Sequence, residues 1–324
     1  MKANQIGPDI IGEWLRHELR VSQNFSVQRV APNVFRISGE ALAETLAVKI
    51  CYDHETGDIS PTEAAIQYHS LVTIAPYLDR FAKNSVPKVF PFLRDHACLV
   101  TQWVIGEALN RYWRDWRKTE HQLVESAARA GDWLRSFHEC RRLPDRPLDL
   151  DELIERLRQL HGQANAAFKS APPVKAGMQL LSDLSHELKD VGIAAAWLHG
   201  DFKPANVILS AEKVFGIDIS LYHEGAVVHD LVHFLLELNL MCLEPLTCRL
   251  SRIRRQMEDG FIAGYSRNEQ FLNRLALSWR MLHLALCIWA ARERRNTRTM
   301  RNWFLRRNLR LVATRLTREL ENRT

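Results

Sequence analysis

Residues 197–209, WLHGDFKPANVIL, contain the residue pattern from which the fold of this 324-residue chain can be inferred. Asn206 follows Asp201 by five residues, and an apolar run typical of a β-strand comes directly after it. A phosphoryl-transfer loop needs an aspartate that accepts the proton of an attacking hydroxyl and an asparagine whose amide oxygen binds magnesium. The segment therefore predicts a catalytic loop with Asp201 as the base and Asn206 as a metal ligand.

Two further aspartates follow this loop. Asp218 lies twelve residues after Asn206, at the end of a predicted strand over 214–217. Because Mg²⁺ on phosphates takes few carboxylate ligands and keeps several waters, Asn206 and Asp218 together form a sufficient set of protein ligands. Asp230 comes twelve residues later and begins a predicted helix over 230–240. We expect Asp230 to cap that helix and to accept hydrogen bonds from the loop backbone.

The remaining pattern predicts an α+β fold. Segments rich in Val, Ile and Leu predict strands at 33–37, 45–51, 86–92 and 97–103. A serine cap followed by Pro61 predicts a helix over 61–75. Apolar residues at helical spacing predict helices over 123–140, 149–167 and 175–190. We therefore expect a small β-rich N-terminal lobe over 1–104 and a larger helical C-terminal lobe over 105–324.

Composition restricts the class of protein. Apolar residues make up 46% of the chain and charged residues 25%, as in ordinary soluble globular proteins. No run of eighteen uncharged apolar residues predicts a transmembrane helix, and the N-terminus lacks the apolar stretch of a signal peptide. The six cysteines form no CxxC pair, which favours reduced thiols over a zinc site. These features predict a cytoplasmic protein.

The C-terminal segment is strongly basic. Residues 251–324 carry 17 arginines and six acidic residues, a net charge of +11. In the last predicted helix, over 301–323, apolar residues form one stripe with arginines beside it. Such a helix can dock on its own protein or make a peripheral contact with an anionic membrane. No nucleic-acid partner is expected, because no recognised reader motif accompanies the charge.

The HGDxxxxN motif resembles the catalytic loop of the aminoglycoside phosphotransferase and choline kinase-like family, within the protein-kinase-like superfamily. Residues 217–220, IDIS, resemble its magnesium-binding segment, and Gly225 with the run that begins at Asp230 is similar to its later signature. The resemblance implies a two-lobed protein-kinase-like fold and the cofactors ATP and Mg²⁺. It also implies that Lys203, which is more typical of protein kinases, contacts the γ-phosphate.

The same resemblance assigns roles in the N-terminal lobe. Lys49, in the segment AVKI, resembles the lysine that binds the α- and β-phosphates, and Glu63 would pair with it. Glu55 is an alternative partner. Residues 99–104, LVTQWV, resemble the hinge between lobes, and the implied adenine-binding residues are Gln102, Trp103 and Val104.

The segment that should cover the nucleotide departs from the family pattern. Residues 29–35, RVAPNVF, contain no glycine, and Asn33 is the candidate to replace a glycine-rich backbone through its side chain. This departure keeps open a non-catalytic, nucleotide-binding pseudokinase as an alternative function.

The acceptor is poorly defined by the sequence. Residues 110–118 interleave aromatic and cationic side chains, which either contact a substrate or form a packed helix start. Their positive charge argues against a polycationic aminoglycoside. The expected reaction is transfer of the γ-phosphate of ATP to a hydroxyl of a small molecule or glycan. Lys203 keeps a protein acceptor as an alternative.

Overall fold

A computed structural model describes residues 5–18, 25–40, 42–53, 56–91, 96–221, 224–244, 249–266, 273–294 and 299–322. The chain forms two compact units. The first unit comprises Met1–Glu107 and Ile208–Leu221, and the second comprises Ala108–Val207 and Tyr222–Thr324. The sequence-based division assigns 208–221 to the C-terminal lobe, whereas this short segment belongs to the first unit.

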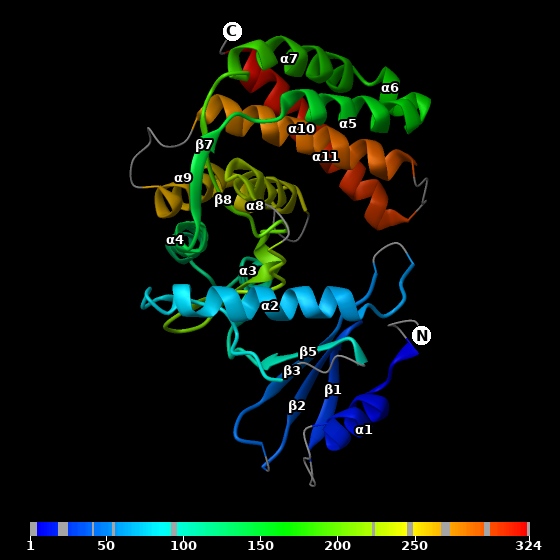
Figure 1. The fold of residues 1–324 in the computed structure, drawn as a ribbon. Coiled ribbons are helices and arrows are strands. Elements are labelled where there is room, and N and C mark those ends of the chain that lie inside the picture. The colour runs from blue at the N-terminus through cyan, green and yellow to red at the C-terminus, as the bar shows by residue number, and fades with distance from the viewer. Residues whose placement is uncertain are drawn as a thin grey trace. The chain divides into compact units, whose positions relative to one another are not determined.

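The core of the first unit is an antiparallel sheet with strand order β1-β2-β3-β5 (Figure 1). Its strands are β1 (Ser26–Ala31), β2 (Val34–Ser38), β3 (Leu46–Ile50) and β5 (Cys98–Gln102). Because side chains alternate between the faces of a strand, Phe35, Ile37 and Val48 are buried together. Helix α1 (Pro8–Glu18) adds Ile11 and Leu15, which lie one helical turn apart, to this core.

Helix α2 (Pro61–Leu78) begins at the predicted residue. The Ser60 hydroxyl accepts a hydrogen bond from the Glu63 N–H at 3.2 Å, and Pro61 lies in the first turn, where a missing N–H costs nothing. A second sheet consists, in this order, of β4 (Asn84–Ser85), β10 (Val214–Gly216), β9 (Val207–Leu209) and β6 (Glu107–Ala108). Since β10 pairs with β4, the residues that follow β10 are held in the first unit.

One predicted strand is absent from the described residues. The strands expected at 33–37, 45–51 and 97–103 are confirmed, but within 86–91 only Val89 forms an isolated bridge, to Thr101. Pro87 and Pro91 explain the difference, because neither has an N–H to donate to a ladder. Phe92, the last residue of that prediction, lies outside the described residues.

The second unit is mainly helical. Its long helices are α4 (Glu120–Glu139), α5 (Leu150–Gln163), α7 (Pro172–Leu188), α8 (Val228–Met241), α9 (Leu250–Tyr265), α10 (Arg274–Arg294) and α11 (Met300–Glu321). The helix predicted over 149–167 ends at residue 163, and Asn165 caps a separate α6 (Ala166–Ser170) by accepting the Phe168 N–H at 2.9 Å. A small sheet has the order β11-β8-β7, with β11 (Glu224–Ala226), β8 (Ile193–Trp197) and β7 (Arg142–Arg146).

Helices α4 and α9 pack at very short range through glycines. A Cβ atom on Gly131 would lie 2.1 Å from the carbonyl oxygen of Phe261, and one on Gly264 would lie 2.0 Å from that of Ala128. Only residues without a side chain allow this approach of the two backbones.

The C-terminal helix α11 docks on its own unit, against α7 and α10 (Figure 1). Its apolar stripe is buried at Leu309, Val312, Leu316 and Leu320. Membrane contact through this stripe is therefore not supported. Among the described residues, no helix combines the length and the apolar character needed to cross a bilayer.

Candidate active site

A buried carboxylate fixes the backbone of the predicted catalytic loop. The N–H groups of His199 and Gly200 donate to the two carboxylate oxygens of Asp230, at 2.7 and 2.9 Å. Asp230 lies in the first turn of α8 and is 1% exposed. Gly200 has a φ of +82°, a conformation that residues with a Cβ atom rarely adopt. The predicted hydrogen bonds from the loop backbone to Asp230 are thus present, whereas the predicted helix cap is not, because α8 begins at Val228 after Val227 and has no side-chain cap.

A histidine of α4 completes the surroundings of Asp230. His138 Nε2 donates to the Asp230 carboxylate at 3.0 Å, and its Nδ1 lies 2.8 Å from the hydroxyl of Tyr265. Burial alone would raise the pKa of Asp230, but the hydrogen bond from His138 and the charges of His138 and His199 outweigh it and lower the pKa. The carboxylate therefore stays ionised and links α4, α8 and the loop.

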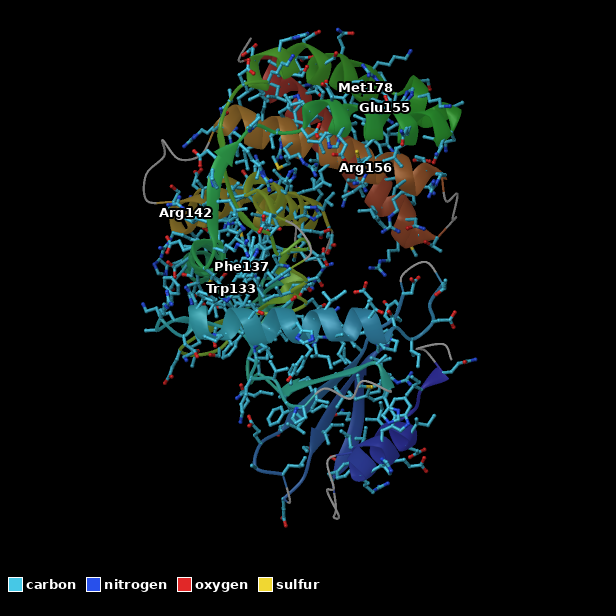
Figure 2. All side chains as sticks on the ribbon, in the orientation of Figure 1. Trp133, Phe137, Arg142, Glu155, Arg156 and Met178 are labelled. Carbon is cyan, nitrogen blue, oxygen red and sulfur yellow. The ribbon has the colours of Figure 1, made fainter. Side chains whose placement is uncertain are left out.

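Aromatic side chains pack against Phe202 of the loop. Phe202 is fully buried and stacks on Trp133 at 5.6 Å and on Phe234 at 5.5 Å between ring centroids. Trp133 in turn stacks on Phe137, one turn further along α4, at 5.4 Å (Figure 2). This cluster anchors Phe202 next to Asp201 in the chain.

The predicted base and its neighbours lie together in the second unit. Asn206, in the short 3₁₀ turn η3 (Pro204–Asn206), donates from Nδ2 to the backbone carbonyl of Asp201 at 2.9 Å and to its carboxylate at 3.2 Å. The Lys203 ammonium forms an ion pair with the same carboxylate. The side chain of Asp201 is half-exposed, at 50%, so the carboxylate is held in position and still accessible.

The first unit brings together Lys49 and Asp218, which are 169 positions apart in the sequence. Lys49 Nζ lies 2.8 Å from Asp218 Oδ1. Burial opposes the charge of Lys49, but the carboxylate of Asp218 outweighs it and raises the lysine pKa. Asp218 has a φ of +62°, which is uncommon for a residue other than glycine. Aspartate tolerates this conformation better than most residues, and non-glycine residues that adopt it cluster at active sites.

The helix residue that contacts Lys49 is not the predicted one. Lys49 Nζ donates to Gln67 Oε1 at 2.9 Å, and among the described residues its hydrogen-bond partners are Gln67 and Asp218. Glu63 is one helical turn nearer the N-terminus of α2, so Gln67 occupies the next position on the same helix face. Glu55, the alternative partner, lies outside the described residues.

The predicted hinge follows β5 directly. The N–H groups of Gln102 and Trp103 donate to the carbonyls of Lys88 and Thr45, each at 2.8 Å. Within the described part of the chain, the Val104 N–H has no such acceptor. Of the three hinge residues, Val104 therefore keeps its backbone donor available to a ligand.

The turn between β1 and β2 shows what Asn33 does in place of a glycine. Its side-chain Nδ2 donates to the carbonyl of Ile50 at 2.9 Å, and its own carbonyl accepts the Ile50 N–H at 2.9 Å. Asn33 thus ties the hairpin turn to β3, which carries Lys49.

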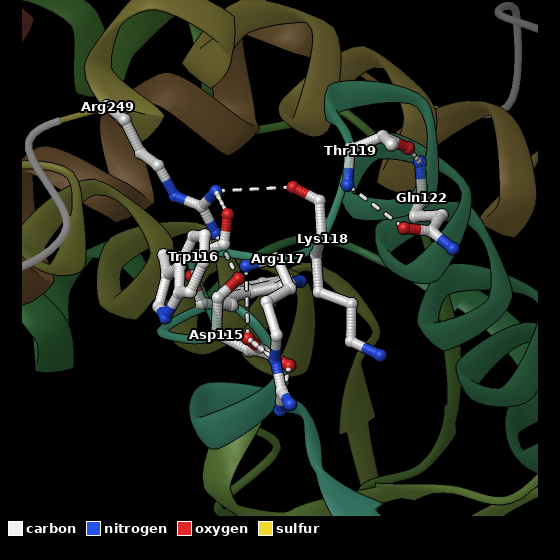
Figure 3. A network of polar contacts seen from close by, with 8 residues as sticks. Asp115, Trp116, Arg117, Lys118, Thr119, Gln122 and Arg249 are labelled. Atoms are coloured by element: carbon white, nitrogen blue, oxygen red, sulfur yellow. Dashed lines mark hydrogen bonds and ion pairs between the residues drawn. The ribbon is translucent and has the colours of Figure 1, made fainter.

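The aromatic and cationic segment 110–118 is held mainly by structural contacts (Figure 3). The Arg249 guanidinium donates to the backbone carbonyls of residues 113, 115, 116 and 118. Trp113 is buried and donates to Ser126 Oγ at 2.9 Å, and Arg117 pairs with Asp115 at 2.8 Å. These contacts favour the interpretation of this segment as a packed helix start, although Trp116 is 81% exposed.

Sequence reasoning missed a polar face of α8. His229, His233 and Glu237 are four residues apart and so share one side of the helix. Burial lowers the pKa of His233, and the charges of Asp201 and Lys203 also act on it. Burial raises the pKa of Glu237, with Lys203 opposing this change. Helix α8 also contacts the 3₁₀ turn η3 of the catalytic loop.

Asn206, in the second unit, and Asp218, in the first, each carry an oxygen of the kind that Mg²⁺ prefers as a ligand. The Asn206 side chain donates through its Nδ2, and in the described residues no hydrogen bond reaches its Oδ1. The Asp218 side chain is 41% exposed. The described residues contain no cluster of three or more His, Cys, Asp or Glu side chains that could hold a metal by themselves.

The α+β fold, with a small β-rich part and a largely helical part, is that of kinase-like phosphotransferases. The chain belongs to the phosphotransferase enzyme family (APH), whose model matches residues 27–271. No curated protein sequence gives a significant match.

Solved structures with low sequence identity share the fold. Choline kinase LicA from Streptococcus pneumoniae is 13% identical with a TM-score of 0.59, over 95% of this chain and 99% of that one. A glucosamine kinase in complex with glucosamine, ADP and inorganic phosphate is 14% identical with a TM-score of 0.64, over 98% and 88%. Spectinomycin phosphotransferase with ADP and spectinomycin is 13% identical with a TM-score of 0.59, over 96% and 99%.

Proposed function

We propose that this chain transfers the γ-phosphate of ATP to a hydroxyl group of a small molecule or glycan. The ion pair between Lys49 and Asp218 supports this most directly. In a kinase-like fold, an ammonium and a carboxylate at these places bind phosphates and a metal ion. Structural neighbours named for choline, glucosamine and spectinomycin, all small hydroxylated molecules, also support a small-molecule acceptor.

Asp201 would accept the proton of the acceptor hydroxyl. The hydroxyl oxygen then forms a bond to the γ-phosphorus while the bond from that phosphorus to the bridging oxygen breaks, and ADP leaves. Lys203 and Asn206 hold the Asp201 carboxylate in place, and Lys203 would also offset charge on the γ-phosphate. Catalysis of this kind depends mainly on positioning and electrostatics.

The remaining residues would bind the nucleotide. Lys49 would position the α- and β-phosphates, and the Val104 N–H would bind adenine. Asn206 and Asp218 would hold Mg²⁺, which offsets negative charge on the phosphates when bound.

Replacement of Asp201 by asparagine tests the proposal. We expect ATP turnover to fall by about 10²–10⁴-fold, the usual contribution of a general base. The variant should still bind ATP with magnesium, which is measured as a ligand-induced increase in Tm. Asp183→Asn, on the exposed side of α7, is the matched control and should keep full activity. Turnover in Asp201→Asn within about twofold of wild type would reject the base assignment.

The same measurements separate the alternatives. A pseudokinase would bind ATP and show no turnover with any acceptor. A protein kinase would transfer labelled phosphate to protein bands, whereas the proposed enzyme transfers it to a metabolite fraction.

A further inference from the structure

The second unit contains a cavity of about 470 Å³ bordered by α5, α8 and α10. Its charged lining is entirely basic, and no aspartate or glutamate is among the described residues that line it. The cationic side chains and histidines are Arg156, Arg280, Arg294, His233 and His283. A cavity with this lining has an uncompensated positive potential.

Arg280 is the most unusual of these groups, because it is a buried cation that has no carboxylate counterion among the described residues. It is 8% exposed, its Nε donates to His229 Nδ1 at 2.9 Å, and its Nη1 lies 3.0 Å from His283 Nδ1. His283 Nε2 contacts the carbonyl of Leu153 at 2.6 Å, so its Nδ1 is the acceptor toward Arg280.

Both imidazoles are neutral. Burial, and after it the Arg280 charge, lowers the pKa of His229 and of His283 to about 3. Burial likewise lowers the pKa of Arg280 to about 10, which still leaves it charged at neutral pH. Buried charges in proteins are normally paired, so this guanidinium is a candidate for an anionic ligand.

The cavity also contains an accessible arginine. Arg156, on α5, is exposed beside α10 (Figure 2), and no ion pair or hydrogen bond of its guanidinium occurs within the described residues. Arg294 donates to the neutral Gln163 at 2.7 Å. Neither arginine forms an ion pair with a carboxylate in the part of the chain that the structure describes.

The polar face of α8 connects this cavity with the catalytic loop. His233 lines the cavity, and the charges of Arg280, Asp201 and Lys203 all act on it. His229, one turn before it, accepts the hydrogen bond from Arg280. Helix α8 also contacts the 3₁₀ turn η3 of the catalytic loop, so a molecule bound in the cavity would lie against a helix that touches this loop.

We propose that this cavity binds a carboxylate, phosphate or sulfate group of the phosphate acceptor, through Arg156 and Arg280. The inference rests on the proposed function and specifies its substrate class as anionic hydroxyl compounds. A guanidinium offers paired N–H donors that match the two oxygens of such a group. Cationic acceptors such as choline would be repelled.

The direct test measures anion binding to the nucleotide-free protein. Sodium sulfate is titrated at constant ionic strength, and its dissociation constant is measured by calorimetry. Arg156→Gln should weaken sulfate binding by about tenfold or more, the effect of losing one charge-assisted contact. Arg158→Gln, two residues along α5 and outside the cavity lining, is the matched control and should bind as wild type. Arg280→Gln is measured only if its melting curve shows a folded protein.

Turnover connects the cavity with the reaction. Glucuronate, glucose and glucosamine share a sugar ring and differ in charge. We expect wild type to prefer glucuronate, and Arg156→Gln to raise its KM by about tenfold with kcat unchanged. Sulfate should compete with the acceptor and not with ATP.

The outcomes separate the two proposals. Sulfate binding that is equal in wild type and Arg156→Gln would overturn the inference. The inference would also be overturned if glucose or glucosamine were turned over faster than glucuronate and the Arg156→Gln variant turned them over like wild type. This result would leave the proposed function intact. Sulfate binding that depends on Arg156, without turnover of any acceptor, would support the anion site and reject the proposed function.

Discussion

Replacement of Asp230 by asparagine should destabilise the second unit strongly. The carboxylate accepts the N–H groups of His199 and Gly200 and the His138 imidazole. An asparagine would best place its oxygen where Oδ2 lies, toward two of these donors, so its amide group would face the Gly200 N–H. An unsatisfied buried N–H costs about 1–3 kcal/mol, and loss of charge weakens the other two bonds by about 1 kcal/mol each.

Removal of the buried negative charge of Asp230 offsets part of this loss of stability. The lowered pKa of Asp230 shows that its hydrogen bonds exceed the cost of burial, so the net change remains destabilising. We expect a decrease in unfolding free energy of about 3 kcal/mol, which for a domain of this size lowers Tm by about 6–12 °C. Thermal melting followed by circular dichroism measures the change, with Asp183→Asn as the exposed control.

The pH dependence of Tm is a second measurement on the same variant. A group whose pKa is lower in the folded state stabilises the protein above its unfolded pKa, near 3.8, and this contribution is lost as the pH falls through the folded pKa. The Tm difference between wild type and variant should therefore be constant from neutral pH down to about 5 and shrink below about 4. A variant that melts within about 2 °C of wild type at pH 7 would refute the reasoning.

Three further substitutions test other contacts. Gly200→Ala should lower stability by about 1–2 kcal/mol because of its positive φ, whereas Gly162→Ala in α5, where nothing lies within 4 Å of the added Cβ, should stabilise by about 0.5–1 kcal/mol; equal melting shifts would contradict this. Gln67→Ala should raise the KM for ATP by about two- to tenfold through loss of a hydrogen bond to the lysine ammonium. If Glu63→Gln raises the KM for ATP more than Gln67→Ala does, Lys49 pairs with Glu63 in the nucleotide complex, as the sequence predicted. Arg249→Gln should cost about 1–3 kcal/mol and increase hydrogen exchange of residues 113–118, and unchanged exchange would speak against its anchoring role.

The catalytic loop could be predicted because its signals are local. The positions of Asp201, Asn206 and Asp230 follow from short spacings, and the structure places the first two together and the third against the loop backbone. The contact between Lys49 and Asp218 could be expected only from the family resemblance. The sequence separates these residues widely, and no local pattern relates a strand lysine to a distant aspartate.

Other elements gave weak or misleading patterns. Strand β1, SVQRVA, is mostly exposed and therefore lacks a clear apolar alternation. Strand β8, IAAAW, is rich in alanine, which favours helices over strands.

The buried cation was not predictable for a different reason. Arg280 lies in a helix with a basic composition, and its burial arises only when α8 and α10 pack together. The contact of Lys49 with Gln67 instead of Glu63 was unpredictable for the same reason, because it depends on the packing of α2 within the first unit.

The close glycine contact between α4 and α9 determines the position of the residues that support the catalytic loop. Tyr265 follows Gly264 directly, and its hydroxyl contacts the imidazole that supports Asp230. The separation of two helix backbones is thereby transmitted, through one phenol and one imidazole, to the loop that contains Asp201. Gly264 lies outside the catalytic loop, yet a single added methyl group at this position would meet the Ala128 carbonyl at 2.0 Å and shift the residues that support the loop.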